Sequence, residues 1–144
     1  MLVWDELEVL ELFAGTGAFS LECLSRGALR ADAVETEALH VKCIADNFRM
    51  FELRNARVFR DDVHRWLKSN QHSYHLIFAD PPHDMPDLKL LPDRILNSAA
   101  IANDGILVLE HNHRDDFSEH DCIVKSRRFS NVTFSFFEKN KRPH

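Results

Sequence analysis

ELFAGTG, residues Glu11 to Gly17, is the stretch of sequence that decides the fold. An apolar strand expected over residues 9–12 leads into it. Its glycines, Gly15 and Gly17, let a ligand approach the backbone closely before a helix begins near Ala18. A strand, a glycine turn and a helix in this order are typical of a nucleotide-binding cradle.

A second motif, FADPPH, residues Phe78 to His83, ends another apolar strand. Asp80 stands there before two prolines, which fix φ and carry no N–H, so the carboxylate sits on rigid backbone. Ligands of open α/β sheets bind beyond the carboxyl ends of the strands. We therefore expect both motifs to face one crevice, with a cofactor beside a second, reacting molecule.

The composition fits one globular domain over residues 1–144, of which 44% are hydrophobic. The 18 Lys and Arg against 23 Asp and Glu give a net charge of −5 at pH 7, which disfavours binding of nucleic acid by overall charge. A local basic patch near the C-terminus is the exception, and it is equally consistent with a solvated edge hairpin. Its residues are Lys125, Arg127, Arg128, Lys139, Lys141 and Arg142.

Three cysteines, Cys23, Cys43 and Cys122, are widely separated, which favours reduced thiols in a cytoplasmic protein. No Cys or His spacing is typical of a zinc site, so we expect no metal. The first ten residues carry three acids and no basic segment, and no apolar run is long enough to span a bilayer. We therefore expect a cytoplasmic protein without membrane association.

Strand-like and helix-like segments alternate along the chain, which is typical of βαβ units. We predict an α/β, Rossmann-like sheet of seven strands, mostly parallel, with a C-terminal antiparallel hairpin. The expected strands are 9–12, 31–34, 56–59, 74–79, 106–110, 121–126 and 131–138. The expected helices are 18–25, 37–50, 63–67 and 88–100, with a turn at 103–105 and a hairpin link at 127–130.

Two acids that follow later strands are candidates for binding a nucleoside. Glu35 comes 18 residues after Gly17, where a carboxylate accepts hydrogen bonds from ribose hydroxyls; the alternative is an exposed acid at a strand end. Asp62 could accept a hydrogen bond from an adenine amino group while Val63 contacts the ring. A plain helix N-cap explains Asp62 equally well.

The FADPPH motif suits the chemistry of an exocyclic amine. The Asp80 carboxylate and the Pro81 carbonyl, held by the ring of Pro82, can both accept hydrogen bonds from one NH₂ group. Such an amine is a poor nucleophile, so orienting it and accepting its developing positive charge assists attack. The flat side chain of His83 would stack on an extruded base. The alternative is a turn that only ends the strand.

These motifs, together with AVE at Glu35, RDDV at residues 60–63, ILVLEH at 106–111 and NVTFSFFE at 131–138, resemble those of class I S-adenosylmethionine-dependent methyltransferases. More closely, the chain is similar to the RsmD family, which methylates the N2 amine of a guanine in 16S ribosomal RNA. The similarity runs from about Val9 to Glu138.

The resemblance implies a monomeric enzyme that transfers a methyl group from S-adenosylmethionine to guanine N2 in an assembling small ribosomal subunit, releasing S-adenosylhomocysteine without a metal. It implies catalytic roles for Asp80, Pro81, Pro82 and His83. It implies cofactor contacts for Glu11, Phe13, Ala14, Gly15, Thr16, Gly17, Glu35, Thr36, Asp62, Val63 and Asp80.

Two departures from the family leave alternatives open. Family members usually have an aromatic residue where His83 stands, and they carry a basic arm before the first strand, where this chain has eight residues. We expect the chain to lack that arm, which would explain its acidic charge. The first alternative is a non-catalytic module that binds RNA or a partner. The others are transfer to DNA adenine or protein glutamine, for which Asn before the prolines is more typical, and a nicotinamide dehydrogenase, disfavoured by Ser20 in place of a third glycine.

Overall fold

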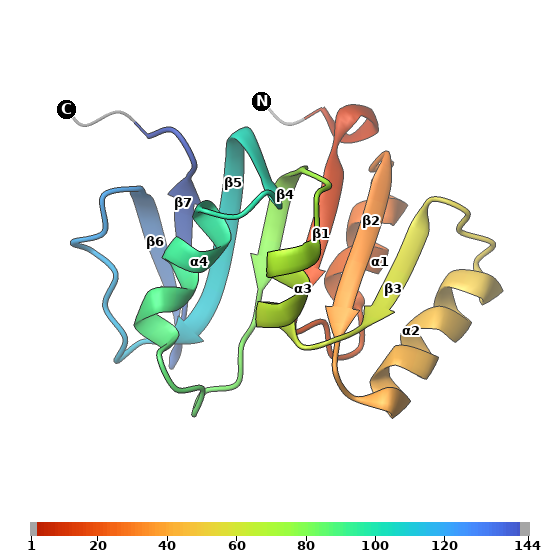
Figure 1. Ribbon diagram of the computed structural model, residues 1–144, viewed down its shortest axis with the longest axis horizontal. Helices are drawn as coiled ribbons and strands as arrows, with labels where there is room; N and C mark the ends of the chain where they lie inside the picture. Colours follow the sequence, from red (N-terminus) through yellow and green to blue (C-terminus); the bar gives the residue numbers. More distant parts are fainter. Residues whose placement is uncertain (1–2, 142–144) are drawn as a thin grey trace.

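A central pair of parallel strands, β1 and β4, organises the seven-stranded sheet in the computed structural model, which describes residues 3–141 (Figure 1). The strand order is β3-β2-β1-β4-β5-β7-β6, and β7 is antiparallel to both of its neighbours. The predicted mostly parallel sheet with a C-terminal antiparallel hairpin is therefore confirmed. The strands are β1 (Glu8–Leu12), β2 (Arg30–Glu35), β3 (Ala56–Arg60), β4 (Tyr74–Ala79), β5 (Ile101–Asn112), β6 (Ile123–Phe129) and β7 (Val132–Glu138).

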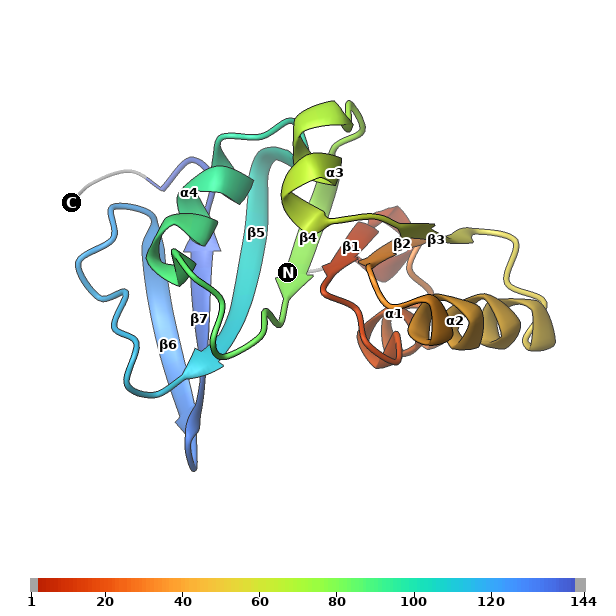
Figure 2. The same ribbon diagram turned by 60° about the horizontal axis from the view of Figure 1, so that its bottom comes forward.

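Helices cover both faces of the sheet, α1 (Ala18–Ser25) and α2 (Ala38–Met50) on one face and α3 (Val63–Ser69) and α4 (Leu91–Leu96) on the other (Figure 2). Two short 3-10 helices, Trp4–Glu6 and Leu88–Leu90, complete the described elements. Each face has its own apolar core, because alternate residues of a strand point to opposite sides. No helix within residues 3–141 is long and apolar enough to span a membrane.

The apolar sequence of β4 reflects its central position. Ile77 and Ala79 are fully buried on the face covered by α3 and α4, and Leu76 is buried on the face of α1 and α2. A parallel strand that is covered on both sides needs apolar residues at successive positions. The prediction of a buried parallel strand over 74–79 is confirmed.

Two expectations around β5 were wrong. The helix expected over 88–100 ends at Leu96, because the Ser98 hydroxyl donates to the Ile95 carbonyl and accepts from the Ala100 N–H, replacing helical bonds. The turn expected at 103–105 lies inside β5, which begins at Ile101. Since Tyr74 pairs with Ile101 and Leu76 with Ile106, these residues form an irregularity within the strand rather than its boundary.

The hairpin link expected at 127–130 was also wrong, because β6 continues to Phe129. Ser130, with φ of 57°, and Asn131 make a two-residue turn, the shortest common hairpin connection. The predicted basic patch is divided accordingly. Lys125, Arg127 and Arg128 lie exposed on β6, whereas Lys139 and Lys141 donate to the carbonyls of Leu96 and Ile123; Arg142 lies outside the described residues.

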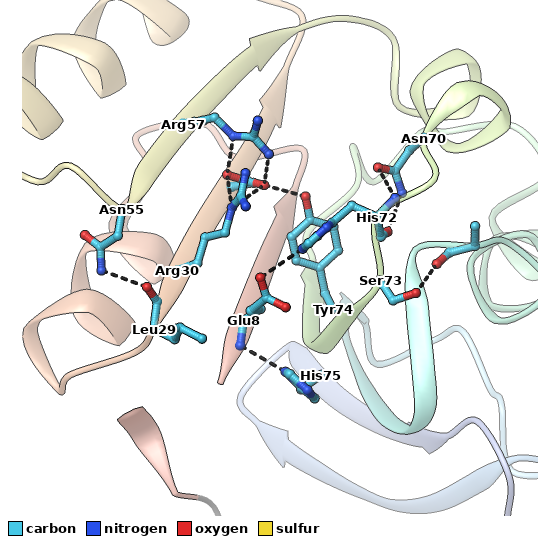
Figure 3. A network of polar contacts seen from close by, with 12 residues as sticks. Glu8, Leu29, Arg30, Asn55, Arg57, Asn70, His72, Ser73, Tyr74 and His75 are labelled. Carbon is cyan, nitrogen blue, oxygen red and sulfur yellow. Dashed lines mark hydrogen bonds and ion pairs between the residues drawn. The ribbon is translucent and has the colours of Figure 1, made fainter. Parts of the chain in front are cut away.

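A buried acid ties three strands together at the amino end of the sheet (Figure 3). Asp32 of β2 has no exposed surface and accepts hydrogen bonds from Arg57 Nε and Nη2 of β3 at 3.2 and 3.0 Å. The Tyr74 hydroxyl of β4 donates to Asp32 Oδ2 at 2.5 Å, and Arg30 completes the cluster at 3.3 Å. A buried carboxylate is tolerated because these donors replace its water.

We expect the Tyr74→Phe substitution to lower the free energy of unfolding by about 1.5–3 kcal/mol, because it removes a hydrogen bond to a buried charged group. Urea denaturation measures the loss. Ser73→Ala is the matched control, since it removes an exposed hydroxyl that bonds only the Ala99 carbonyl. Equal stability of the two variants would show that the Asp32 cluster does not depend on Tyr74.

Candidate active site

The turn after β1 has an unusual backbone that explains its glycines. Phe13, Gly15 and Gly17 have φ values of 57°, 58° and 76°, a region that favours glycine. A Cβ atom at Gly17 would lie 2.9 Å from Ile44 Cγ1, whereas one at Gly15 would meet nothing within 4 Å. Gly17 is therefore required by packing, and Gly15 leaves open space in which a ligand can approach the backbone.

Glu35, the last residue of β2, holds this turn in place. It is only 7% exposed, so the alternative of an exposed strand-end acid was wrong. Its Oε1 atom accepts from the Gly15 N–H and its Oε2 atom from the Glu37 N–H, each at 2.8 Å. A carboxylate offers about four lone-pair sites, so acceptor capacity remains for hydroxyl groups of a ligand.

Glu11 of β1 fixes the start of α1. Its Oε1 atom accepts from the Ser20 N–H at 3.0 Å and from the Ser20 hydroxyl at 2.7 Å. Burial raises the pKa of the Glu11 carboxyl, and the bonds from Ser20 partly oppose that rise. The serine that replaces the third glycine of a dinucleotide motif therefore contributes both donors to this buried acid.

Asp62, after β3, is the N-cap of α3, as one of its two interpretations predicted. Its Oδ1 atom accepts from the Arg65 N–H at 3.0 Å, which leaves the second carboxylate oxygen available. Val63 is 2% exposed and packs into the core. The carboxylate borders a hollow of about 350 Å³, whose lining residues are Thr36, Arg60, Asp61, Asp62 and Arg65.

The tip that carries Asp80 lies directly beside the glycine turn. Leu12 pairs with Ala79, and the Asp80 N–H donates to the Leu12 carbonyl at 3.4 Å. The structure thus brings the two sequence motifs together at the carboxyl edge of the sheet. Pro81 is buried, while the side chains of Pro82 and His83 are exposed to solvent.

A residue not predicted as part of the site, Glu110, completes this edge. The parallel register that pairs Ala79 with Leu109 sets Asp80 beside Glu110. Burial raises the pKa of both groups, and the Asp80 charge raises that of Glu110 further. The available signal was the position of Glu110 at the end of an expected strand, as for Glu35.

Along the edge, the functional candidates follow the strand order. The strands β3, β2, β1, β4 and β5 are successive neighbours in the sheet, and each carries one candidate at or just beyond its carboxyl end. In that order the candidates are Asp62, Glu35, the glycine turn, Asp80 and Glu110. A ligand lying along this edge can therefore contact all of them. Within residues 3–141, no group of three or more His, Cys, Asp or Glu side chains is arranged to hold a metal ion.

A family model described as "Conserved hypothetical protein 95" matches residues 3–138. The chain belongs to this RsmD-like family. The resemblance to the RsmD family that the motifs predicted is confirmed. One relative, the Bacillus subtilis protein named "Putative rRNA methyltransferase YlbH", is 32% identical over 114 residues, which cover 76% of this chain and 62% of that protein.

Another RsmD-like relative, "Ribosomal RNA small subunit methyltransferase D" of Escherichia coli K12, is 26% identical over 105 residues, covering 73% of this chain and 53% of the relative. This chain thus matches about half to three fifths of the length of these proteins. The structure of Haemophilus influenzae "putative methylase HI0767" has a TM-score of 0.86 at 17% identity, over 96% of this chain and 89% of that one. The fold is that of class I methyltransferases.

We expect Asp80→Asn to raise the melting temperature at pH 7 by about 1–3 °C, because the raised pKa of Asp80 means that its ionised form is less favourable in the folded chain than in the unfolded chain. The gain shrinks as the pH falls toward 3.8, the ordinary Asp value, where the folded carboxyl is protonated. Calorimetric melting at several pH values measures it. Asp84→Asn, at an exposed position, is the control, and a loss of stability at pH 7 for Asp80→Asn alone would contradict the account.

Proposed function

We propose that the chain is an S-adenosylmethionine-dependent methyltransferase that acts on the exocyclic N2 amine of a guanine in 16S ribosomal RNA. The observation that carries the proposal is the hydrogen bond between the Asp80 N–H and the Leu12 carbonyl, which joins the proposed amine site to the proposed cofactor turn. The names of the relatives support ribosomal RNA as the substrate class, and the resemblance of the motifs supports guanine N2.

The residues at the glycine turn fit the cofactor. Open space beside Gly15 admits the methionine part, and the free acceptor sites of Glu35 suit the ribose hydroxyls. The second Asp62 oxygen and the hollow beside it suit the adenine amino group. When bound, S-adenosylmethionine supplies an electrophilic methyl group on a positively charged sulfur. The carboxyl groups along the edge favour that positive charge.

The Asp80 tip fits the acceptor. Its carboxylate and the Pro81 carbonyl accept hydrogen bonds from the amine, which orients the nitrogen lone pair toward the glycine turn. As the nitrogen forms a bond to the methyl carbon and the sulfur–carbon bond breaks, positive charge develops on the nitrogen, where the Asp80 carboxylate would stabilise it until the methylated amine loses a proton. The exposed ring of His83 is free to stack on the base. The two prolines keep this geometry rigid because their φ angles are fixed.

Binding of S-adenosylhomocysteine tests the cofactor site. We expect Glu35→Ala to weaken binding by about 10- to 100-fold in titration calorimetry, because it removes a charged acceptor and releases the Gly15 N–H. Glu37→Ala is the matched control, since its side chain is exposed and only its backbone N–H contacts Glu35. No binding by the unaltered chain, or equal binding by both variants, would reject this site.

Tritiated methyl transfer to small ribosomal subunits that lack the modification tests the activity. We expect Asp80→Ala to lower the rate by about 10²-fold or more, with Asp84→Ala close to the unaltered chain. Mass spectrometry of the product then identifies the modified nucleoside. N2-methylguanosine supports the proposal, whereas methylated adenine or glutamine would support another amine acceptor. Cofactor binding without any transfer would support a non-catalytic module.

A further inference from the structure

We propose that Glu110 is a specificity-determining residue that accepts a hydrogen bond from the ring N1–H of guanine while Asp80 accepts from the adjacent N2 amine. The inference rests on the proposed function and deepens it, because it assigns the choice of base to a residue of this chain. The juxtaposition of two carboxyl groups at the ends of neighbouring parallel strands is the observation behind it.

The sheet geometry points both side chains the same way. Phe78 pairs with Val108, and in a strand the side chain two residues further along points to the same face. Asp80 and Glu110 are each two residues beyond this pair, so they share the face of Phe78 and Val108. That face is the one covered by α1, because the rings of Phe78 and Phe19 lie 4.6 Å apart. The glycine turn leads directly into α1, so the carboxyl pair is on the side of the proposed cofactor.

The remaining surroundings leave Glu110 without a structural partner of its own. Its cross-strand neighbour on β7 is Phe134, which has no polar atom in its side chain, and none of the hydrogen bonds or ion pairs among the described residues involves the Glu110 carboxyl group. Glu110 is half-buried, so solvent or a ligand can reach it. Glu11, in contrast, accepts two hydrogen bonds from Ser20 through its Oε1 atom.

The chemistry of two adjacent acceptors selects guanine among purines. The guanine edge presents the N2 amine and the N1–H side by side, and both are donors. Adenine presents an amine beside an N1 atom that can only accept a hydrogen bond. An ionised Glu110 can also only accept, so it could form no hydrogen bond with that atom. A site built for two donors rejects such a base because a buried polar group is left unpaired.

A pH dependence follows from the two adjacent carboxyl groups. They occupy neighbouring register positions, burial raises the pKa of both, and binding two donors requires both groups to be ionised. The groups that face the pair are His83, which favours ionisation of both carboxyl groups, and Glu11, whose pKa the Asp80 charge raises. Arg127 of β6 pairs with Phe134 of β7, which in turn pairs with Glu110, so these three residues lie side by side across the sheet. The kcat/KM for guanine should therefore rise with pH through the titration of the pair.

The experiment compares RNA fragments that carry either guanine or 2-aminopurine at the position where mass spectrometry has located the methyl group. 2-Aminopurine keeps the N2 amine but lacks the N1–H. We expect the unaltered chain to prefer guanine by about 10- to 100-fold in kcat/KM. Glu110→Gln should reduce or reverse this preference, because its amide can donate to the N1 atom of 2-aminopurine.

Carboxyl ¹³C NMR of the chain without RNA provides an independent measurement. Because the charge of Asp80 raises the pKa of Glu110, the Glu110 titration should move to lower pH in the Asp80→Asn variant. Glu138→Gln is the matched control: its residue pairs with Ile106 on the same face of the sheet but is exposed and distant along the strand from Asp80. It should change neither the titration nor the base preference.

Each outcome decides one claim. A Glu110→Gln variant that transfers methyl groups with the unaltered preference for guanine would overturn the inference while leaving the proposed function intact. An unaltered chain that transfers no methyl group to any RNA would overturn the proposed function, and the inference with it. If Glu110→Gln is inactive on both RNAs, the Glu110→Asp variant is tested in its place. A lower rate with the preference for guanine retained supports the role of the carboxylate. Loss of that preference contradicts it.

Discussion

The pairing of β1 with β4 is the constraint on which the site depends. Because Leu12 lies opposite Ala79, the glycine turn and the Asp80 tip leave the sheet side by side, and a backbone hydrogen bond links Asp80 to Leu12. Parallel strands in the centre of a sheet are largely apolar on both faces. The functional groups therefore gather at and just beyond the carboxyl ends of the strands, and the strand order sets the order in which they follow one another along the edge.

Each acid at this edge has both a structural and a chemical consequence. Glu11 and Glu35 stabilise backbone turns through their hydrogen bonds, so they contribute to the fold. Burial disfavours the ionised forms of Glu11, Asp80 and Glu110 alike, and for Glu11 the hydrogen bonds from Ser20 partly offset this cost. Ligand-binding sites typically contain ionisable groups whose charged form is unfavourable until a ligand binds them. The Asp32 cluster at the other end of β2 shows the contrasting solution, in which protein donors satisfy the buried acid completely.

Much of the fold and site could be predicted from the sequence because the decisive signals are local. The glycine turn, Glu35 at a strand end and Asp62 as an N-cap each depend on a few neighbouring residues, and the structure places them as expected. Glu110 was missed because its importance depends on the pairing of β4 with β5, which no short segment encodes. The continuation of β5 through 103–105 was missed for the same reason, since an irregular strand and a turn share the residues Asn, Asp and Gly.

A crystal structure of the chain with S-adenosylhomocysteine tests the central claim most directly. If both ligands share one crevice, the sulfur should lie beside Gly15 and within about 6–7 Å of the Asp80 carboxylate. That distance is the sum of a hydrogen bond to the amine and a near-attack contact between the amine and the methyl group. It also predicts that the Glu35 carboxylate contacts the ribose. A ligand bound with its sulfur facing away from Asp80, or bound at another edge of the sheet, would contradict the account.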